Sequence, residues 1–242
     1  MAVNPMKTRI YLMDTEQLRD PDTAERVYQA LPEKRRKAAD RYRYPEDRLR
    51  SLASGALLLK LCETEGLSPA MEDLTENAYG KPCFSAHPEI CFNLSHSGSK
   101  VILGVSDRAI GCDIEIIHDT PIIQEIARNF FSPEEYQTLM AETDPAARCR
   151  LFYRLWTLRE SFVKETGLGL YLSLKSFRIH IDPEGLARVQ LTGLPEARFR
   201  EYVSENVSFF EYNIDERYCC SCCIAQDGQP YERPDLIPYV CS

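Results

Sequence analysis

The chain has 242 residues, of which 44% are hydrophobic and 27% are charged, and its formal net charge is -8. This composition is close to the average of folded globular proteins, and it excludes the collagen-like, disordered and disulfide-scaffold classes. The acidic balance argues against nonspecific binding to nucleic acids.

The amino-terminal segment has no positively charged stretch followed by an apolar core and a cleavage site, so it does not resemble a secretory signal. No apolar run approaches the roughly 18 to 20 residues that are needed to cross a bilayer. We therefore expect a cytoplasmic protein with no membrane segment.

The first half of the chain is predicted to contain a strand at residues 7–14 and helices at residues 23–42 and 45–66. The second helix has apolar residues at helical spacing and ends at a glycine. Three short apolar runs follow, separated by glycine, serine and aspartate. They predict an antiparallel meander of strands at residues 91–97, 100–107 and 109–117.

The second half returns to a helical pattern at residues 119–169. A typical helix start, with an N-cap serine and a proline in the first turn, occurs at residues 132–135. A long helix begins after Asp144 and is expected to end at Gly167. From residue 172 onward, apolar and polar residues alternate again, which predicts a second small sheet.

This order of elements indicates an α+β fold with a pseudo-two-fold arrangement of two similar α+β halves, each with helices packed on a small antiparallel sheet. We assign residues 1–108 to the amino-terminal half and residues 109–242 to the carboxy-terminal half. The division depends on the pattern of elements, because no residue-level repeat is present.

Four of the ten cysteines, Cys219, Cys220, Cys222 and Cys223, lie in one short run. A structural zinc site needs two pairs that are separated by a loop, and this run lacks that spacing. It predicts a buried strand that uses cysteine as a small hydrophobic residue. Metal binding or redox chemistry is the alternative.

Residues 34–50 form a basic segment, in which eight lysines and arginines accompany three acidic residues. In an acidic protein, such a segment favours a specific anion over polyanions in general. A solvated helix face is an equally simple alternative. The basic residues are Lys34, Arg35, Arg36, Lys37, Arg41, Arg43, Arg48 and Arg50.

Asp113 and Glu115 alternate with Cys112, Ile114 and Ile116 in a predicted strand. Because successive side chains of a strand point to opposite faces, the two carboxylates project from one face. Two adjacent carboxylates need a compensating cation, and hard oxygen ligands suit magnesium. An ordinary surface strand with two acids is the alternative.

Trp156, Glu160 and Lys164 are spaced four residues apart in the last long helix, so they share one helix face. An acid and a base therefore lie beneath the only tryptophan of the chain. The alternative is a weak surface ion pair beside a tryptophan of the core.

Residues 92–98 place His96 between two serines at the end of a strand, and the tripeptide GKP, which contains Lys81, precedes them. These side chains can present hydrogen-bond donors to a phosphate. A capped turn is the alternative.

Taken together, the segments GKP, FNLSHS, GCDIE and LWTLRESFVK, in this order, resemble the 4′-phosphopantetheinyl transferases. The 110 or so residues before the acidic strand make the chain similar to the larger, surfactin-synthetase-associated type. The resemblance also extends to residues 32–55. It departs from the family pattern at Arg159, where that pattern has a lysine, and the two side chains differ in shape and in hydrogen-bond donors.

The resemblance implies that the arm of coenzyme A, the co-substrate, is transferred to a serine of an apo acyl or peptidyl carrier protein. It implies that Mg²⁺, with Mn²⁺ as an alternative, is held by Asp113, Glu115 and Glu160, directly or through water. The implied catalytic residues are Asp113, Glu160 as the base and Lys164 at the departing 3′,5′-ADP. Asp113 is then an exposed metal ligand, whose loss would remove activity with little effect on stability.

The resemblance also assigns coenzyme A phosphate and adenine binding to the amino-terminal half, and the metal site and catalytic helix to the carboxy-terminal half. It implies a pseudo-dimeric monomer with the active site between the halves. The carrier protein is expected to dock beside this cleft, on apolar residues within 122–131. The residues implied to contact coenzyme A are Lys34, Lys37, Arg50, Ser51, Lys81, Ser95 and His96.

Two other functions remain open. One is a different magnesium-dependent phosphoryl or pyrophosphoryl transferase or hydrolase, although the chain has no GxxxxGK[ST] loop to support an NTPase. The other is a noncatalytic module that binds coenzyme A or a carrier protein. The presence of Asp113, Glu115, Glu160 and Lys164 argues against this second alternative.

Overall fold

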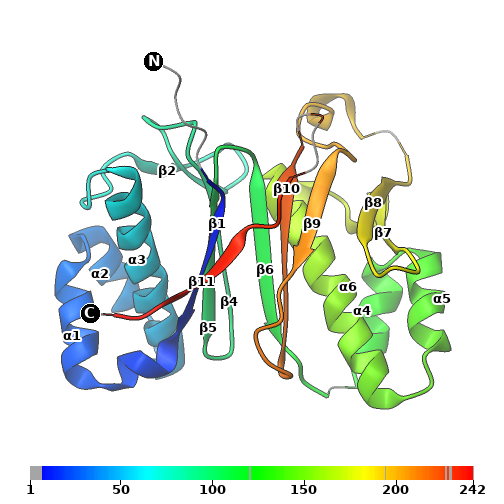
Figure 1. Ribbon diagram of the computed structural model, residues 1–242, viewed down its shortest axis with the longest axis horizontal. Helices are drawn as coiled ribbons and strands as arrows, with labels where there is room; N and C mark the ends of the chain where they lie inside the picture. Colours follow the sequence, from blue (N-terminus) through cyan, green and yellow to red (C-terminus); the bar gives the residue numbers. More distant parts are fainter. Residues whose placement is uncertain (1–6, 120, 194, 227, 229–230, 242) are drawn as a thin grey trace.

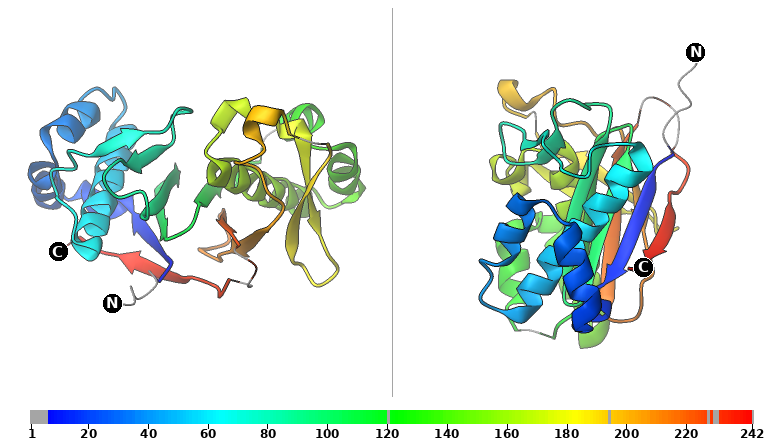
Figure 2. Two further views of the ribbon diagram at one scale, coloured as in Figure 1. Left: turned by 90° about the horizontal axis from the view of Figure 1, so that it is seen from above. Right: turned by 90° about the vertical axis from the view of Figure 1, so that its left-hand side faces the viewer.

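The computed structural model describes residues 7–119, 121–193, 195–226, 228 and 231–241. The chain forms an α+β fold, so the predicted class is confirmed. Two sheets lie side by side in the middle of the molecule, with one group of helices on each outer side (Figure 1). The view from above in Figure 2 separates the same two halves.

The first sheet has a mixed topology. Strand β5 is antiparallel to both of its neighbours, whereas the last strand of the chain, β11, is parallel to β1. In spatial order the sheet consists of β11 (Asp235–Tyr239), β1 (Arg9–Asp14), β5 (Lys100–Ser106) and β4 (Cys91–Ser97).

Three helices cover the outer face of this sheet, and their apolar side chains form the first core cluster. They are α1 (Pro21–Ala30), α2 (Glu33–Ala39) and α3 (Pro45–Glu65). The prediction for α3 is confirmed, including its end at Gly66, which adopts a left-handed conformation with φ of 70°.

The single helix predicted at residues 23–42 is wrong, because the chain forms α1 and α2 there instead. Leu31 is extended, with φ of -74° and ψ of 145°. The next residue is Pro32, which disfavours a helical conformation of the residue before it and has no N–H to continue the helix. The helical composition on both sides of Pro32 masked this break.

The second sheet contains β6 (Ile110–Ile116), β10 (Tyr218–Ala225) and β9 (Val207–Glu211), in this spatial order and antiparallel throughout. The predicted meander is therefore wrong in its third strand, since β6 leaves the sheet of β4 and β5. Ile10 and Ile102 of the first sheet pack against Cys112 and Ile114 of the second. Both sheets have an apolar inner face, and burying these faces against each other separates β6 from β5.

The cysteine-rich run is strand β10, as predicted. Cys220, Cys222 and Cys223 are buried and Cys219 is half-buried, and all four are free thiols. The three buried cysteines serve as small apolar side chains of the core.

Helices α4 (Ile123–Phe130), α5 (Pro133–Ala141) and α6 (Pro145–Thr166) cover the outer side of the second sheet. The predicted start of α5 is a capping box between Ser132 and Glu135, and α6 ends at Gly167 as predicted. The remaining elements are two hairpins and four 3₁₀ turns. They are β2 (Leu74–Glu76) with β3 (Pro82–Phe84), β7 (Phe177–Ile181) with β8 (Ala187–Leu191), η1 (Thr15–Arg19), η2 (Gly169–Tyr171), η3 (Leu174–Ser176) and η4 (Ala197–Phe199).

The chain crosses from the first sheet to the second between β5 and β6, close to residues 108 and 109. It returns at its end, where β11 lies beside β1 in the first sheet (Figure 1). The functional division into residues 1–108 and 109–242 stays a prediction. Within the described ranges, no helix is both long and apolar enough to cross a membrane.

Gly111 allows β6 and α6 to pack with their backbones in contact. A Cβ atom at this position would lie 2.0 Å from the carbonyl oxygen of Ser161 and 2.3 Å from the backbone nitrogen of Glu165. Neither atom can rotate away, because both belong to the backbone of α6. Only glycine is therefore compatible with this spacing.

We predict that Gly111→Ala lowers the free energy of unfolding by at least about 2 kcal/mol, because the strand and the helix must separate. Urea unfolding followed by circular dichroism measures this change. Gly193→Ala is the matched control, because no heavy atom lies within 4 Å of the Cβ position at Gly193. Equal stabilities of the two variants would contradict the proposed constraint.

Candidate functional site

Side chains from β4, β6 and α6 line a cavity of about 350 Å³ between the two halves of the molecule. It brings together six of the residues that the sequence singled out as site residues, and the tryptophan of the same helix face. The lining residues are Leu94, Ser95, His96, Asp113, Glu115, Trp156, Glu160 and Lys164.

Two serines of β4 face the two carboxylates of β6 across the gap between the sheets. Ser95 Oγ donates to Asp113 Oδ1 at 2.8 Å, and Ser97 Oγ donates to Glu115 Oε2 at 2.7 Å. Each pair of residues is spaced two apart along its strand, so the side chains of each strand point the same way. The predicted common face of Asp113 and Glu115 is thus confirmed.

Lys164 connects the helix to both strands. Its Nζ atom donates to Asp113 Oδ1 at 2.6 Å and to Ser95 Oγ at 2.9 Å. Burial opposes the charge of the ammonium, but the carboxylate of Asp113 outweighs this effect and raises the pKa of Lys164. Lys164 is therefore a cation at neutral pH.

The three carboxylates of the cavity carry more negative charge than Lys164 offsets. Burial, and then the charge of Asp113, raises the pKa of Glu115 to about 7 and also raises the pKa of Glu160. The expectation that Asp113 is exposed is wrong, because its side chain is enclosed by β4 and α6 and the residue is only 3% exposed. Removing it would leave Lys164 without its anion, so a loss of stability is expected as well.

The cavity has the donor chemistry of a site for a hard cation. Asp113 Oδ2 is buried and has no hydrogen-bond partner among the described residues. Within the residues that the structure describes, no group of three or more His, Cys, Asp or Glu side chains is arranged to hold a metal ion without other ligands. Mg²⁺ is usually bound by one or two carboxylates, with water and substrate phosphates as the other ligands. The residues present fit that mode of binding.

His96 and Arg50 form the basic side of this region. Burial, and then the positive charge of Arg50, lowers the pKa of His96. Arg50 Nη1 donates to the carbonyl oxygen of Gly98 at 3.0 Å, and Arg50 also pairs with Asp47. Ser51 follows Arg50 in α3 and is half-buried, but it does not line this cavity.

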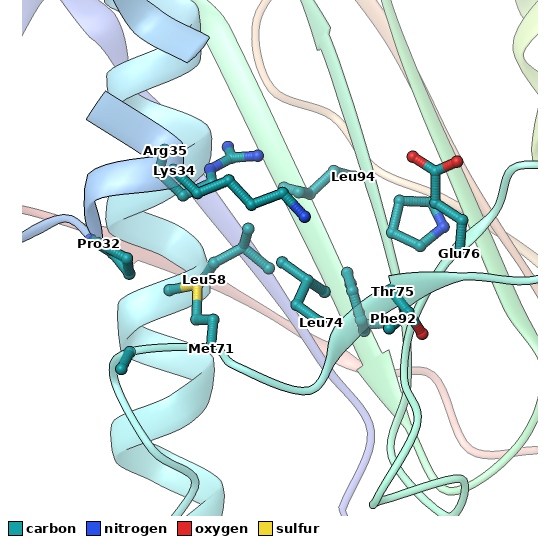
Figure 3. A pocket seen from close by; sticks show the side chains of 12 residues that line it. Pro32, Lys34, Arg35, Leu58, Met71, Leu74, Thr75, Glu76, Phe92 and Leu94 are labelled. Atoms are coloured by element: carbon teal, nitrogen blue, oxygen red, sulfur yellow. The ribbon is translucent and has the colours of Figure 1, made fainter. Parts of the chain in front are cut away.

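A second cavity, of about 450 Å³, adjoins the first at Leu94, which lines both. Lys34 and Arg35 of α2 reach into it opposite the side chains of β2 and β4 (Figure 3). Arg35 Nε is buried without a hydrogen bond to any described residue, and burial lowers the pKa of the guanidinium. An anion is the natural partner for such a group.

Two of the predicted coenzyme-binding lysines are held elsewhere. Lys37 forms an exposed ion pair with Glu33 at 2.5 Å on the surface of α2. Lys81 Nζ donates to the carbonyl oxygens of Ile110 at 2.8 Å and Glu165 at 3.2 Å. Their contacts with phosphate stay predictions.

A third cavity, of about 500 Å³, lies on the other side of the acidic site and shares Glu160 and Lys164 with it. Its walls are mostly apolar, and they come from the end of α4, from α6 and from the segment after α6. Phe130, Val163, Leu170, Leu172 and Leu174 provide the apolar surface.

Sequence reasoning did not pair Ser97 with Glu115, did not single out Arg35 within the basic segment, and missed this apolar cavity. Ser97 has the same spacing to Ser95 as Glu115 has to Asp113, so matching the two alternating strands would have found it. Arg35 was included in the basic segment, but no local signal separates it from its neighbours. The apolar cavity depends on segments that meet only in the folded chain.

Comparison with known proteins shows a consistent similarity over most of the chain. The family model described as 4′-phosphopantetheinyl transferase superfamily matches residues 109–223, and the model described as 4′-phosphopantetheinyl transferase, N-terminal, matches residues 20–107. A 4′-phosphopantetheinyl transferase of Bacillus subtilis is 34% identical over 203 residues, which cover 83% of this chain and 85% of that protein. The transferase Sfp of Bacillus subtilis strain 168 is 34% identical over 200 residues, which cover 82% and 84%.

Among solved structures, the holo-[acyl-carrier-protein] synthase of Thermotoga maritima is similar to part of the chain. The TM-score is 0.37 at 13% sequence identity, and the match covers 48% of this chain and 61% of that structure.

The buried carboxyl group of Glu165, which has Lys81 as its nearby cation, predicts a pH-dependent stability. Burial raises the pKa of Glu165 to about 8, above its ordinary value of 4.5. A raised carboxyl pKa means that the folded state binds more protons than the unfolded state between these values, so stability falls as the pH rises from 5 to 8.

Glu165→Gln removes this titration. We expect the stability of the variant, relative to the unaltered protein, to increase by roughly 1 to 3 kcal/mol between pH 5 and pH 8. Urea unfolding of both proteins across this range measures the difference. Parallel curves would mean that Glu165 is ionised throughout and fully compensated by Lys81.

Proposed function

The chain belongs to the 4′-phosphopantetheinyl transferase superfamily, and from this premise we propose that Asp113, Glu115, Glu160 and Lys164 carry out its reaction. The protein transfers the 4′-phosphopantetheine moiety of coenzyme A to a serine of an apo carrier protein and releases 3′,5′-ADP. The observation that carries the assignment of residues is their meeting in one cavity between β4, β6 and α6.

Asp113, Glu115 and Glu160 are the residues that would hold Mg²⁺, or Mn²⁺ in its place, either directly or through water. Asp113 Oδ2 has no hydrogen-bond partner among the residues that the structure describes, and the pKa values of Glu115 and Glu160 are raised. Both observations support this assignment, because a cation would bind the free oxygen and stabilise the charged carboxylates. When bound, the ion supplies positive charge that offsets the charge growing on the pyrophosphate oxygens.

The order of the three cavities supports one orientation of coenzyme A. Lys34 and Arg35 in one outer cavity suit the adenosine and its 3′-phosphate, while His96 lines the middle cavity, close enough to Arg50 for that cation to lower its pKa. The pyrophosphate then lies in the middle cavity, and the arm extends into the apolar cavity beyond Glu160 and Lys164. Ser51, Lys37 and Lys81 are assigned to the same coenzyme on family resemblance alone.

In this orientation the two halves of the chain contribute different parts of the active site. The amino-terminal half, residues 1–108, provides the groups for the phosphate and adenine end of coenzyme A. The carboxy-terminal half, residues 109–242, provides the carboxylates and the catalytic helix. One chain contains both parts of the site, which supports a pseudo-dimeric monomer.

The reaction exchanges one phosphorus–oxygen bond for another. The carrier serine Oγ bonds to the phosphorus atom that bears the arm, and the bond from that phosphorus to 3′,5′-ADP breaks. Glu160 accepts the serine proton, since its raised pKa makes it a stronger base than an ordinary carboxylate. The ammonium of Lys164, held by Asp113, stabilises the charge on the departing oxygen.

The carrier protein is proposed to dock beside the apolar cavity. Ile122 and Phe130, at the two ends of α4, are 52% and 41% exposed, and Arg128 between them is also exposed. Exposed apolar side chains with a cation among them suit an acidic helix that carries apolar residues. This surface would determine whether the protein modifies an acyl or a peptidyl carrier.

We expect this protein to add one phosphopantetheinyl group to an apo carrier protein in the presence of coenzyme A and magnesium. Intact mass spectrometry of the carrier detects the gain, and a parallel sample with a chelator tests the metal. A folded protein that binds coenzyme A but modifies neither acyl nor peptidyl carriers would favour a binding module instead.

Glu160→Gln is expected to lower kcat by about 100-fold or more with little change in stability, because the amide cannot accept the serine proton. The carrier assay measures kcat, and thermal unfolding tests the fold. Glu63→Gln, an exposed position on α3, is the control that should retain full activity. An unchanged kcat for Glu160→Gln would assign the proton transfer to another group.

A further inference from the structure

Arg159 occupies the position of a lysine in the family pattern, but it lies away from the reacting groups. It is adjacent to Glu160 in sequence, yet its side chain is on a different face of α6 and is 0% exposed. A buried guanidinium is stable only where acceptors satisfy it. Its partners therefore indicate what it does.

The hydrogen-bond partners of Arg159 include one carboxylate and two backbone carbonyl groups of residues that line a cavity. Arg159 Nη1 donates to both carboxylate oxygens of Glu135 at 2.7 Å. Its Nη2 atom donates to the carbonyl oxygen of Phe130 at 2.9 Å and also to the carbonyl oxygen of Leu174. The guanidinium lies 4.5 Å from the ring centre of Phe177, which adds a cation–π contact.

Glu135 is itself fixed at three points. It accepts from Ser132 N at 2.7 Å within the capping box of α5, and from Ile179 N of β7 at 2.8 Å. With Arg159 as its third partner, it is held by α5, by β7 and by α6 at once. The ion pair with Glu135 therefore fixes the position of the guanidinium, so that Nη2 can hold the segments that contain Phe130 and Leu174 in place.

The two carbonyl groups that Nη2 holds belong to two different segments of the wall of the apolar cavity. Phe130 ends α4, and Leu174 begins η3 in the segment after α6, and both residues line the cavity that shares Glu160 and Lys164 with the acidic site. One planar group thus sets how far apart these two segments lie. Lysine cannot replace it, because an ammonium lacks the planar, forked arrangement of donors.

We propose that Arg159 is a positioning residue that sets the width of the cavity for the arm of coenzyme A and binds no phosphate itself. The proposal rests on the proposed function, which assigns this cavity to the arm. It predicts that Arg159 strengthens the binding of coenzyme A. The same residue should not affect the binding of 3′,5′-ADP, which lacks the arm.

The test compares two ligands that differ by the arm. Calorimetry measures the binding of coenzyme A and of 3′,5′-ADP to the full chain and to Arg159→Lys. We expect the variant to bind coenzyme A about tenfold or more weakly, because small displacements of a cavity wall are costly, and to bind 3′,5′-ADP as before. Arg154→Lys is the control, since Arg154 lies on the same helix but does not line the cavity, and it makes a bidentate pair with Glu211 of β9.

Trp156 provides a readout that does not depend on ligands. It is the only tryptophan, and its ring lies 6.2 Å from that of Phe130. Movement of the Phe130 wall should shift the tryptophan fluorescence of Arg159→Lys, whereas Arg154→Lys should leave it unchanged. If Arg159→Lys fails to fold, Glu135→Gln, which keeps the shape of the acidic partner, replaces it and should show the same selectivity for coenzyme A.

Equal weakening of both ligands would overturn the proposal, as it would indicate a phosphate contact or a general loss of structure. Unchanged binding of both ligands would overturn it as well. Carrier modification by the unaltered protein is measured in parallel and reports on the proposed function by itself. If the unaltered protein modifies the carrier and Arg159→Lys binds both ligands normally, the proposed function stands and the proposed role of Arg159 is wrong.

Discussion

The backbone contact between β6 and α6 at Gly111 is the constraint on which the site depends. It brings the catalytic helix close enough for Lys164 to lie 2.6 Å from Asp113 and 2.9 Å from Ser95. The same lysine therefore joins the helix, the acidic strand and a strand of the other sheet. A larger residue at position 111 would separate the helix from the strand and break this connection before it touched any reacting group.

The electrostatics of the cavity follow from that geometry. Three carboxylates meet one ammonium, and burial adds to their mutual repulsion, so that Glu115 and Glu160 resist ionisation. Such a site is incomplete without further positive charge. Basic groups around Lys34 and His96 suit an anionic substrate on one side, while the carboxylates suit a divalent cation in the middle.

Two cationic residues of α6 lie on different faces of the helix and have different roles. Lys164 is half-buried, points into the acidic cavity and is assigned to the chemistry. Arg159 is fully buried and its outer nitrogen atoms bond to Glu135 and to backbone carbonyls. Positions 159 and 164 are not separated by a whole number of helical turns, so the two side chains diverge. Position on the helix, more than charge, decides which of them can reach a substrate.

Local pattern was sufficient for several features of this protein. Alternation in β6 placed Asp113 and Glu115 on one face, the four-residue spacing in α6 aligned Trp156, Glu160 and Lys164, and glycines marked the ends of α3 and α6. These features depend on backbone periodicity and capping, which neighbouring residues determine. The order of the motifs along the chain also indicated the family.

The tertiary structure alone decided the rest. That β6 leaves the sheet of β5, that β11 returns to β1, and that Asp113 is enclosed all depend on which apolar faces pack together. The resemblance assigned Lys81 to coenzyme A and left the role of Arg159 open, and only the fold supplied the carbonyl groups that bind Lys81 and the carboxylate that binds Arg159. Such partners lie far apart in the chain, so no local pattern contains them, and packing determines which of them meet.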